Sequence, residues 1–186
     1  MRFDGIVLAG GTGARVGGVD KTALEVGGVA LLERVVAALR DAERVVVVGP
    51  ERAVARPVTW VREDPPGAGP VHALAAGLGH ARADVAVVLA ADLPFVGPPL
   101  VARLVAAAGG RDAALAVDAR GRDQPLLAAY RTAALRAALA ALPSTRAASM
   151  RALVRTMTIA RVDAGDAAFD CDTWDDVAAA RRRARG

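Results

Sequence analysis

Short apolar runs alternate with longer alanine-rich segments along the chain, and this alternation restricts the fold more than any other feature. Residues Arg44–Val48 include four successive valines, and Val85–Ala90 contains no polar residue. Continuously apolar strands are typical of parallel sheets that helices cover on both faces, because a sheet with one wet face alternates apolar and polar residues. The sequence therefore predicts an α/β fold with three layers, α/β/α, and a mainly parallel, Rossmann-like sheet.

The individual elements follow from the same pattern. Strands are expected at Gly5–Ala9, Arg44–Val48, Val58–Arg62, Val85–Ala90 (central), Ala113–Val117, Leu126–Tyr130 and Met157–Val162 (at an edge). Helices are expected at Leu31–Arg40, Val71–Ala83, Pro98–Ala108, Thr132–Leu142, Arg146–Arg155 and from Thr173 to the end, with Thr173 as the N-cap. A turn is expected at Arg120–Asp123. With no linker or repeat in 186 residues, we expect one domain over residues 1–186.

Composition narrows the possible surroundings and partners. The chain is 54% apolar but only 3% aromatic, so the core must be built from Ala, Val and Leu. It has no membrane-length apolar stretch and no leader-like N-terminus, and its single cysteine, Cys171, fits a reducing compartment. Four arginines near the C-terminus equal the net charge of +4, and the aromatic interleaving of nucleic-acid surfaces is lacking. We expect a cytoplasmic protein, monomeric or weakly self-associating, that binds neither nucleic acid nor a membrane.

A glycine-rich loop with cations follows the first expected strand. Gly10, Gly11 and Gly13 come directly after the apolar run, and Arg15 and Lys21 follow within a dozen residues. Glycines let backbone N–H groups approach a polyphosphate closely, and the cations neutralise its charge. The pattern predicts a nucleotide-binding loop, with a ligand-free turn as the alternative.

Two familiar glycine motifs do not fit this loop. A P-loop ends in Gly-Lys-Ser/Thr, with four residues between its two glycines. Gly13 and Gly18 have this spacing, but Val19 stands where the lysine is required, and Lys21 lies two residues further along the chain. The dinucleotide fingerprint needs a third very small residue where Val16 stands. The loop is therefore of another kind, which argues against a dinucleotide-dependent oxidoreductase.

Carboxylates follow other expected strands at the same edge of the sheet, where ligands bind in open α/β folds. Asp92 comes after the apolar strand Val85–Ala90. A carboxylate there suits Mg²⁺, which takes one or two carboxylates together with substrate phosphates, and we favour this over a turn cap. Asp64 is also expected to be either a metal ligand or a turn cap, and neither interpretation is preferred. For Asp172 the alternatives are a second carboxylate of the site or, slightly favoured, a residue that merely precedes the Thr173 cap.

Other polar residues give weaker signals. His72 and His80 are expected on one helix, and no cysteine or acid cluster accompanies them, so a zinc site is not predicted. Cys171 is expected to be a small buried residue rather than a nucleophile. Gln124-Pro125 is expected either to contact a substrate or to enter an edge strand.

The opening stretch resembles the signature of nucleotidyltransferases that activate cofactors and sugars. The matching residues are Leu8-Ala9-Gly10-Gly11-x-Gly13-x-Arg15-x-Gly17-Gly18-x-Asp20-Lys21. This version is most similar to the molybdenum cofactor guanylyltransferase family. Further elements fall in that family's order along nearly the whole chain: Gly69-Pro70, Asp92-x-Pro94-Phe95, Gln124-Pro125-Leu126 and Asp172-Thr173-Trp174-Asp175-Asp176.

The resemblance implies the fold of nucleotide-diphospho-sugar transferases and a specific reaction. Molybdopterin's terminal phosphate would attack the α-phosphate of GTP and release pyrophosphate, with Mg²⁺ as cofactor. GTP would bind at Leu8, Ala9, Gly10, Gly11, Lys21, Asp64, Gly69, Pro70 and Asp92. Arg15, Lys21 and Asp92 would form the catalytic set, with Asp92 as the metal ligand.

Two departures from the family pattern keep alternatives open. Val48-Gly49-Pro50 replaces a polar element after the second strand, and Asp170-Cys171-Asp172-Thr173 resembles the Asp-x-Asp-Thr of sister families. A cytidylyltransferase or a nucleotidyltransferase with another phosphorylated acceptor therefore stays possible. A non-catalytic nucleotide-binding protein is the alternative from a different class.

Overall fold

A mainly parallel sheet forms the middle of the molecule in a computed structural model, which describes residues 1–10 and 21–185. Seven strands of the described residues lie in the order β5-β4-β1-β6-β8-β7-β9. Their bounds are β1 Phe3–Leu8, β4 Val45–Val48, β5 Thr59–Val61, β6 Val85–Ala90, β7 Ala113–Val117, β8 Asp123–Arg131 and β9 Ile159–Asp163. Strand β8 runs antiparallel to both neighbours, while the other pairings are parallel. As expected, β6 is central and β9 lies at an edge.

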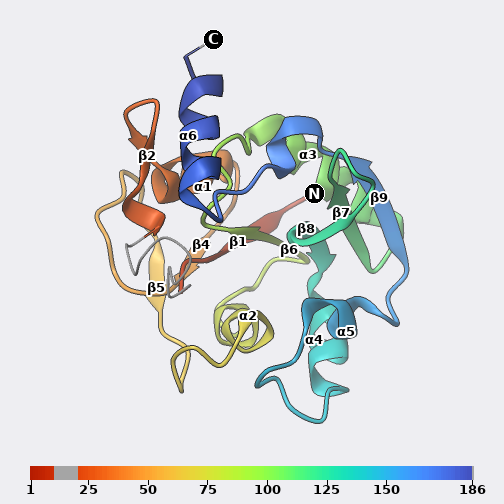
Figure 1. The fold of residues 1–186 in the computed structure, drawn as a ribbon. Coiled ribbons are helices and arrows are strands. Elements are labelled where there is room, and N and C mark those ends of the chain that lie inside the picture. Colours follow the sequence, from red (N-terminus) through yellow and green to blue (C-terminus); the bar gives the residue numbers. More distant parts are fainter. Residues whose placement is uncertain (11–20, 186) are drawn as a thin grey trace.

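Helices cover both faces of this sheet (Figure 1). Helices α1 (Leu31–Ala38) and α3 (Pro98–Ala107) pack on one face. Helices α2 (Pro70–Leu78), α4 (Thr132–Ala140) and α5 (Met150–Val154) pack on the other. The expected three-layer α/β fold is confirmed. No helix among the described residues has the length and apolar character needed to cross a membrane.

A third, smaller apolar cluster lies beside the sheet. It joins the hairpin of β2 (Glu25–Val26) and β3 (Val29–Ala30) to helix α6 (Trp174–Arg183). The hairpin was not expected from the sequence, although Gly27 and Gly28 mark its two-residue turn with φ values of 59° and 75°. Thr173 caps α6 as expected, and its hydroxyl accepts a bond from the Asp176 N–H.

Helix α2 is shorter than the sequence pattern predicts. It ends at Leu78 rather than Ala83, because the Arg82 and Ala83 N–H groups donate to the carboxylate of Asp4 instead of continuing a helix. His80 therefore lies in the turn after the helix, and the expectation that His72 and His80 share a helix is wrong.

Two further boundaries differ for local reasons. Helix α5 begins at Met150 rather than Arg146, since Ala147 has a left-handed φ of 55° and Ser149 caps the helix through the Ala152 N–H. Strand β8 begins at Asp123 rather than Leu126, and it lies between β6 and β7. Gln124-Pro125 is therefore not in an edge strand. The ladder between β7 and β8 is irregular there, which lets Pro125 lie within the strand.

The remaining short elements are 3-10 helices. They are η2 (Lys21–Ala23), η3 (Ala108–Gly110) and η4 (Gly165–Ala168). The first of them leads directly into the β2–β3 hairpin, so the end of the glycine-rich loop is followed by an ordered turn.

Candidate functional site

The loops that follow the parallel strands meet at one edge of the sheet. Backbone hydrogen bonds extend the strand pairing into these loops: Ala9 N–H donates to Val48 O at 2.8 Å, and Ala91 N–H donates to Leu8 O at 3.1 Å. Gly49 N–H likewise donates to Val61 O at 2.9 Å. Residues 9–10, 49–50, 62–69 and 91–97 are thereby gathered at the carboxyl edge, where α/β sheets bind ligands.

Gly49 lies against the start of the loop that follows β1. Its φ is 153°, and a Cβ there would lie 2.8 Å from the carbonyl carbon and oxygen of Ala9. The β4 loop can press against the start of the glycine-rich loop only because position 49 has no side chain.

The loop after β5, residues 62–69, lies next to Gly10. Glu63 Oε1 accepts a hydrogen bond of 2.9 Å from Gly67 N–H, and a Cβ on Gly10 would lie 3.6 Å from the same oxygen. Glu63 Oε2 is buried without a hydrogen-bond partner in the described part of the chain. Sequence reasoning selected its exposed neighbour Asp64 and missed Glu63, for which two adjacent acidic residues were the available signal.

Gly69 and Pro70 form the junction between this loop and α2. Gly69 has a φ of 106° and precedes Pro70, the first residue of the helix. A proline fits there because the first helical N–H has no intrahelical acceptor.

Asp92 lies where the loop after β6 meets the segment before α6. The Cys171 N–H donates to the Asp92 carbonyl oxygen at 3.0 Å, so the segment before α6 runs directly past the loop that follows β6. Cys171 is fully buried with Val26, Leu31 and Val177, as expected for a structural cysteine. Its neighbours Asp170 and Asp172 are thus brought close to the Asp92 backbone from a position almost 80 residues away in sequence.

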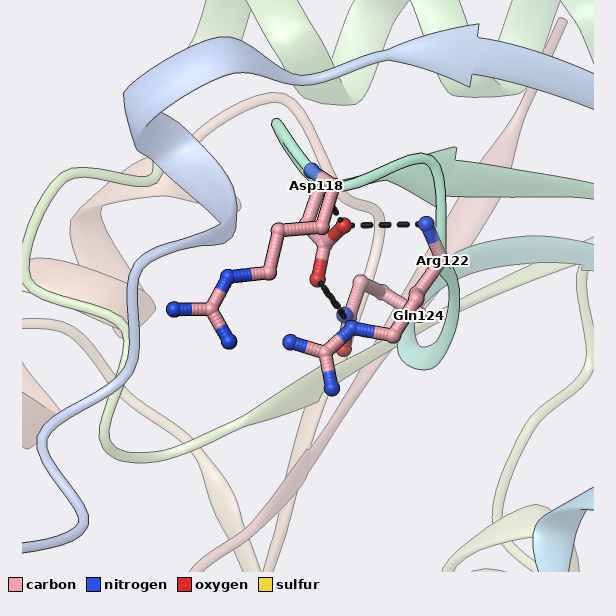
Figure 2. Close-up of polar contacts among 4 residues, drawn as sticks. Asp118, Arg122 and Gln124 are labelled. Atoms are coloured by element: carbon pink, nitrogen blue, oxygen red, sulfur yellow. Dashed lines mark hydrogen bonds and ion pairs between the residues drawn. The ribbon is translucent and has the colours of Figure 1, made fainter.

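The β7–β8 hairpin brings further charged groups to the same edge, because β7 runs parallel to β6. Figure 2 shows the polar contacts of Asp118, Arg122 and Gln124 in this hairpin. Asp118 Oδ1 accepts from the N–H groups of Arg120 and Arg122, both at 2.9 Å. Its Oδ2 accepts from the Gln124 amide at 3.0 Å and lies 3.3 Å from Arg122 Nε. The Arg122 N–H, followed by the other donors, lowers the pKa of Asp118. The turn expected in this region is present, with Gly121 at φ 75°.

The structure thus gathers seven of the predicted residues at one sheet edge: Leu8 at the end of β1, Pro70 at the start of α2, and Ala9, Gly10, Asp64, Gly69 and Asp92 in the loops. Gly11 and Arg15 lie outside the described residues, as does the side chain of Lys21. Arg122 and Gln124 lie in the β7–β8 hairpin, on the opposite side of β6 from β1.

Comparison with known proteins identifies the family of the chain. The family of the MobA-like NTP transferase domain matches residues 5–162. The chain belongs to this family. It is 32% identical to a molybdenum cofactor guanylyltransferase of Shewanella sp. (strain MR-4) over 68% of each chain. It is 33% identical to that of Bradyrhizobium sp. (strain ORS 278), over 97% of this chain and 92% of the relative.

A solved structure extends the likeness to a sister activity. The 2-C-methyl-D-erythritol 4-phosphate cytidylyltransferase from Thermus thermophilus is 26% identical, with a TM-score of 0.76 over the full length of both chains. The protein is therefore a nucleotidyltransferase of the MobA-like family, with the fold of nucleotide-diphospho-sugar transferases.

Proposed function

We propose that this MobA-like transferase is a Mg²⁺-dependent guanylyltransferase that transfers GMP from GTP to the terminal phosphate of molybdopterin. The observation that carries the proposal is the similarity to relatives named molybdenum cofactor guanylyltransferase, one of which matches over 97% of this chain. The layout of the sheet edge agrees with it, since Asp92 follows β6, which lies between β1 and β8.

The two substrates have separate places in this proposal. GTP binds over β1, β4 and β5, with Leu8, Ala9, Gly10 and Gly11 around the nucleotide and Arg15 and Lys21 at its phosphates. The β5–α2 loop with Asp64, Gly69 and Pro70 lies beside the nucleoside. Molybdopterin binds over β8 and β7, where Arg122 and Gln124 offer donors to its phosphate.

The reaction is an in-line substitution at phosphorus. A terminal phosphate oxygen of molybdopterin forms a bond to the α-phosphorus of GTP, the bond from that phosphorus to the bridging oxygen breaks, and pyrophosphate leaves. No covalent enzyme intermediate is needed, so the residues contribute alignment and charge neutralisation.

The donors at the sheet edge fit a magnesium ion. Asp92 supplies a carboxylate, and the Cys171–Asp92 backbone contact brings Asp172 to the same loop as a second one. One or two carboxylates with substrate phosphates are the usual ligands of Mg²⁺. When bound, the ion would stabilise the negative charge that develops on the phosphates.

Nucleotide choice is tested by thermal unfolding with each of the four NTPs and Mg²⁺. A ligand at a hundred times its Kd adds about 2.7 kcal/mol of stability, and we expect GTP to give the largest rise in Tm. A larger rise with CTP would overturn the guanylyl assignment in favour of a cytidylyltransferase, the second candidate that the Thermus thermophilus structure supports.

Catalysis is tested by pyrophosphate release with molybdopterin as acceptor. We expect Lys21→Ala and Asp92→Asn each to reduce the rate by about 10²-fold or more through lost phosphate and metal stabilisation. Asp41→Asn, at an exposed surface position, is the control and keeps full activity. Nucleotide binding without pyrophosphate release in the wild type would favour a non-catalytic nucleotide-binding protein.

A further inference from the structure

His72 joins two loops that are far apart in the sequence. It lies in the first turn of α2, and its ring contacts the β5–α2 loop (residues 62–69) and the α4–α5 loop (residues 141–149). The Nε2 atom lies 2.8 Å from the Asp64 carbonyl oxygen, and Nδ1 lies 2.8 Å from Thr145 Oγ1.

The direction of these hydrogen bonds follows from the chemistry of the partners. A carbonyl oxygen only accepts, so Nε2 carries a proton and donates to Asp64 O. In the neutral ring Nδ1 then accepts from the Thr145 hydroxyl. The imidazole is thus the central member of a chain of hydrogen bonds from Thr145 to the backbone of Asp64.

A second contact joins the same two loops. The Ala147 N–H donates to Ala68 O at 2.8 Å, and a Cβ on Gly69 would lie 3.8 Å from the Ala147 backbone. Ala147 has a φ of 55°, a left-handed conformation that is unfavourable for an alanine. The α4–α5 loop adopts this unfavourable conformation where it contacts the β5–α2 loop.

The Glu63–Gly67 hydrogen bond holds the β5–α2 loop from within, whereas His72 and Ala147 hold it from outside. Since the Glu63 side chain of this loop borders Gly10, a shift of the β5–α2 loop changes the surroundings of Gly10.

We propose that His72 is a positioning residue for nucleotide recognition, which acts by bracing the β5–α2 loop against the α4–α5 loop. The proposal rests on the proposed function, in which the β5–α2 loop lies beside the nucleoside. A braced loop binds the base without a further loss of entropy on ordering. Loss of the brace therefore weakens nucleotide binding and base discrimination and leaves the phosphoryl-transfer step nearly unchanged.

The test compares His72→Ala with His80→Ala, a histidine substitution in the exposed turn after the same helix. For His72→Ala we expect the KM for the preferred nucleotide to rise about tenfold, kcat to change less than about twofold, and the preference between GTP and CTP to decrease. His80→Ala changes none of these. His72→Gln keeps an N–H donor for Asp64 O, so we expect its KM to be close to the wild-type value.

Thr145→Val probes the other end of the brace. It removes the hydroxyl that meets Nδ1, and we expect a smaller rise in KM, of about threefold. The double variant with His72→Ala is no worse than His72→Ala alone, because both substitutions remove the same connection. Additive effects would contradict a common brace.

Hydrogen exchange of the protein without nucleotide makes the test independent of activity. Peptides that cover residues 62–69 are expected to exchange faster in His72→Ala than in the wild type or His80→Ala. Unchanged exchange overturns the brace, and faster exchange with unchanged KM and base preference overturns its role in recognition. If the wild type transfers no nucleotide, the proposed function fails, and binding of GTP and CTP then decides the role of His72.

Discussion

Asp4 is a buried carboxylate within the first strand of the sheet. Its side chain is completely buried, and Oδ2 accepts hydrogen bonds from the N–H groups of Arg82 and Ala83, at 2.6 and 2.9 Å. These bonds determine where α2 ends and where the chain turns into β6. Asp4 lies in β1 far from the carboxyl edge, so its role is structural.

Replacing Asp4 by alanine is expected to destabilise the fold by about 2–3 kcal/mol, because two backbone N–H groups lose their acceptor. The measurement is the free energy of unfolding in urea. Asp41→Ala is the matched control, since its side chain is 71% exposed, and it should change stability by less than about 0.5 kcal/mol. A loss for Asp4→Ala as small as that of the control would refute the structural role.

The residues of the candidate site differ in how clearly the sequence alone reveals them. Asp92 was recognisable because a carboxylate directly follows a wholly apolar strand. Glu63 and Arg122 were not, because their significance depends on neighbours: Gly10 beside Glu63, and Asp118 beside Arg122. For Glu63 the sequence offers the adjacent acidic pair Glu63-Asp64, which does not show that Glu63 is the member beside Gly10. For Arg122 no local pattern differs from that of an ordinary surface charge.

Helix α2 approaches the sheet closely at Gly77. A Cβ there would lie 2.7 Å from Ile6 Cγ2 in β1 and 2.8 Å from Val48 Cγ2 at the end of β4. Both strands lead into loops of the candidate site, and α2 itself follows Gly69 and Pro70. The spacing between α2 and the sheet therefore sets the position of the β5–α2 loop relative to Gly10.

Gly77→Ala is expected to lower stability by about 1–2 kcal/mol, since overpacking exceeds the roughly 1 kcal/mol that alanine gains in a helix. For a chain of this size, thermal unfolding should show a Tm lower by about 3–6 °C. Gly110→Ala serves as the control, because a Cβ there meets nothing within 4 Å. A Gly77→Ala protein as stable as the wild type would mean that α2 can move outward without penalty.

At the scale of the whole molecule, the sheet ends at β9, which pairs only with β7 among the described strands. Asp112, just before β7, holds this edge: Oδ2 accepts from Thr158 N–H at 2.8 Å and from the Thr158 hydroxyl at 2.7 Å. The Thr158 N–H, and then its hydroxyl, lower the pKa of Asp112 in the folded protein.

The sign of the pH effect follows from this lowered pKa. The folded state favours the carboxylate, so the contribution is fully present above the unfolded-state pKa of about 3.9 and is lost as the pH falls through the lower folded-state value. Asp112→Asn should therefore be less stable than the wild type at pH 7, with the difference vanishing in strong acid. Urea midpoints over a pH series measure this, and a difference that stays constant below pH 4 would contradict it.

The sequence alone determined the features that depend on neighbouring residues. Apolar runs predicted the strands and the central position of β6, prolines marked the starts of α2 and α3, and Thr173 predicted the start of α6. These signals are local, because strand burial and helix capping act within a few residues of the chain.

Only the tertiary structure decided the features that join distant segments. Asp4 ends α2 from 78 residues away, Cys171 connects the Asp170–Asp172 segment to Asp92, and His72 links Asp64 to Thr145. Each of these contacts exists because packing of helices on the sheet brings the partners together. No periodic pattern in the sequence indicates which of these residues contact one another, so only the folded structure identifies the pairs.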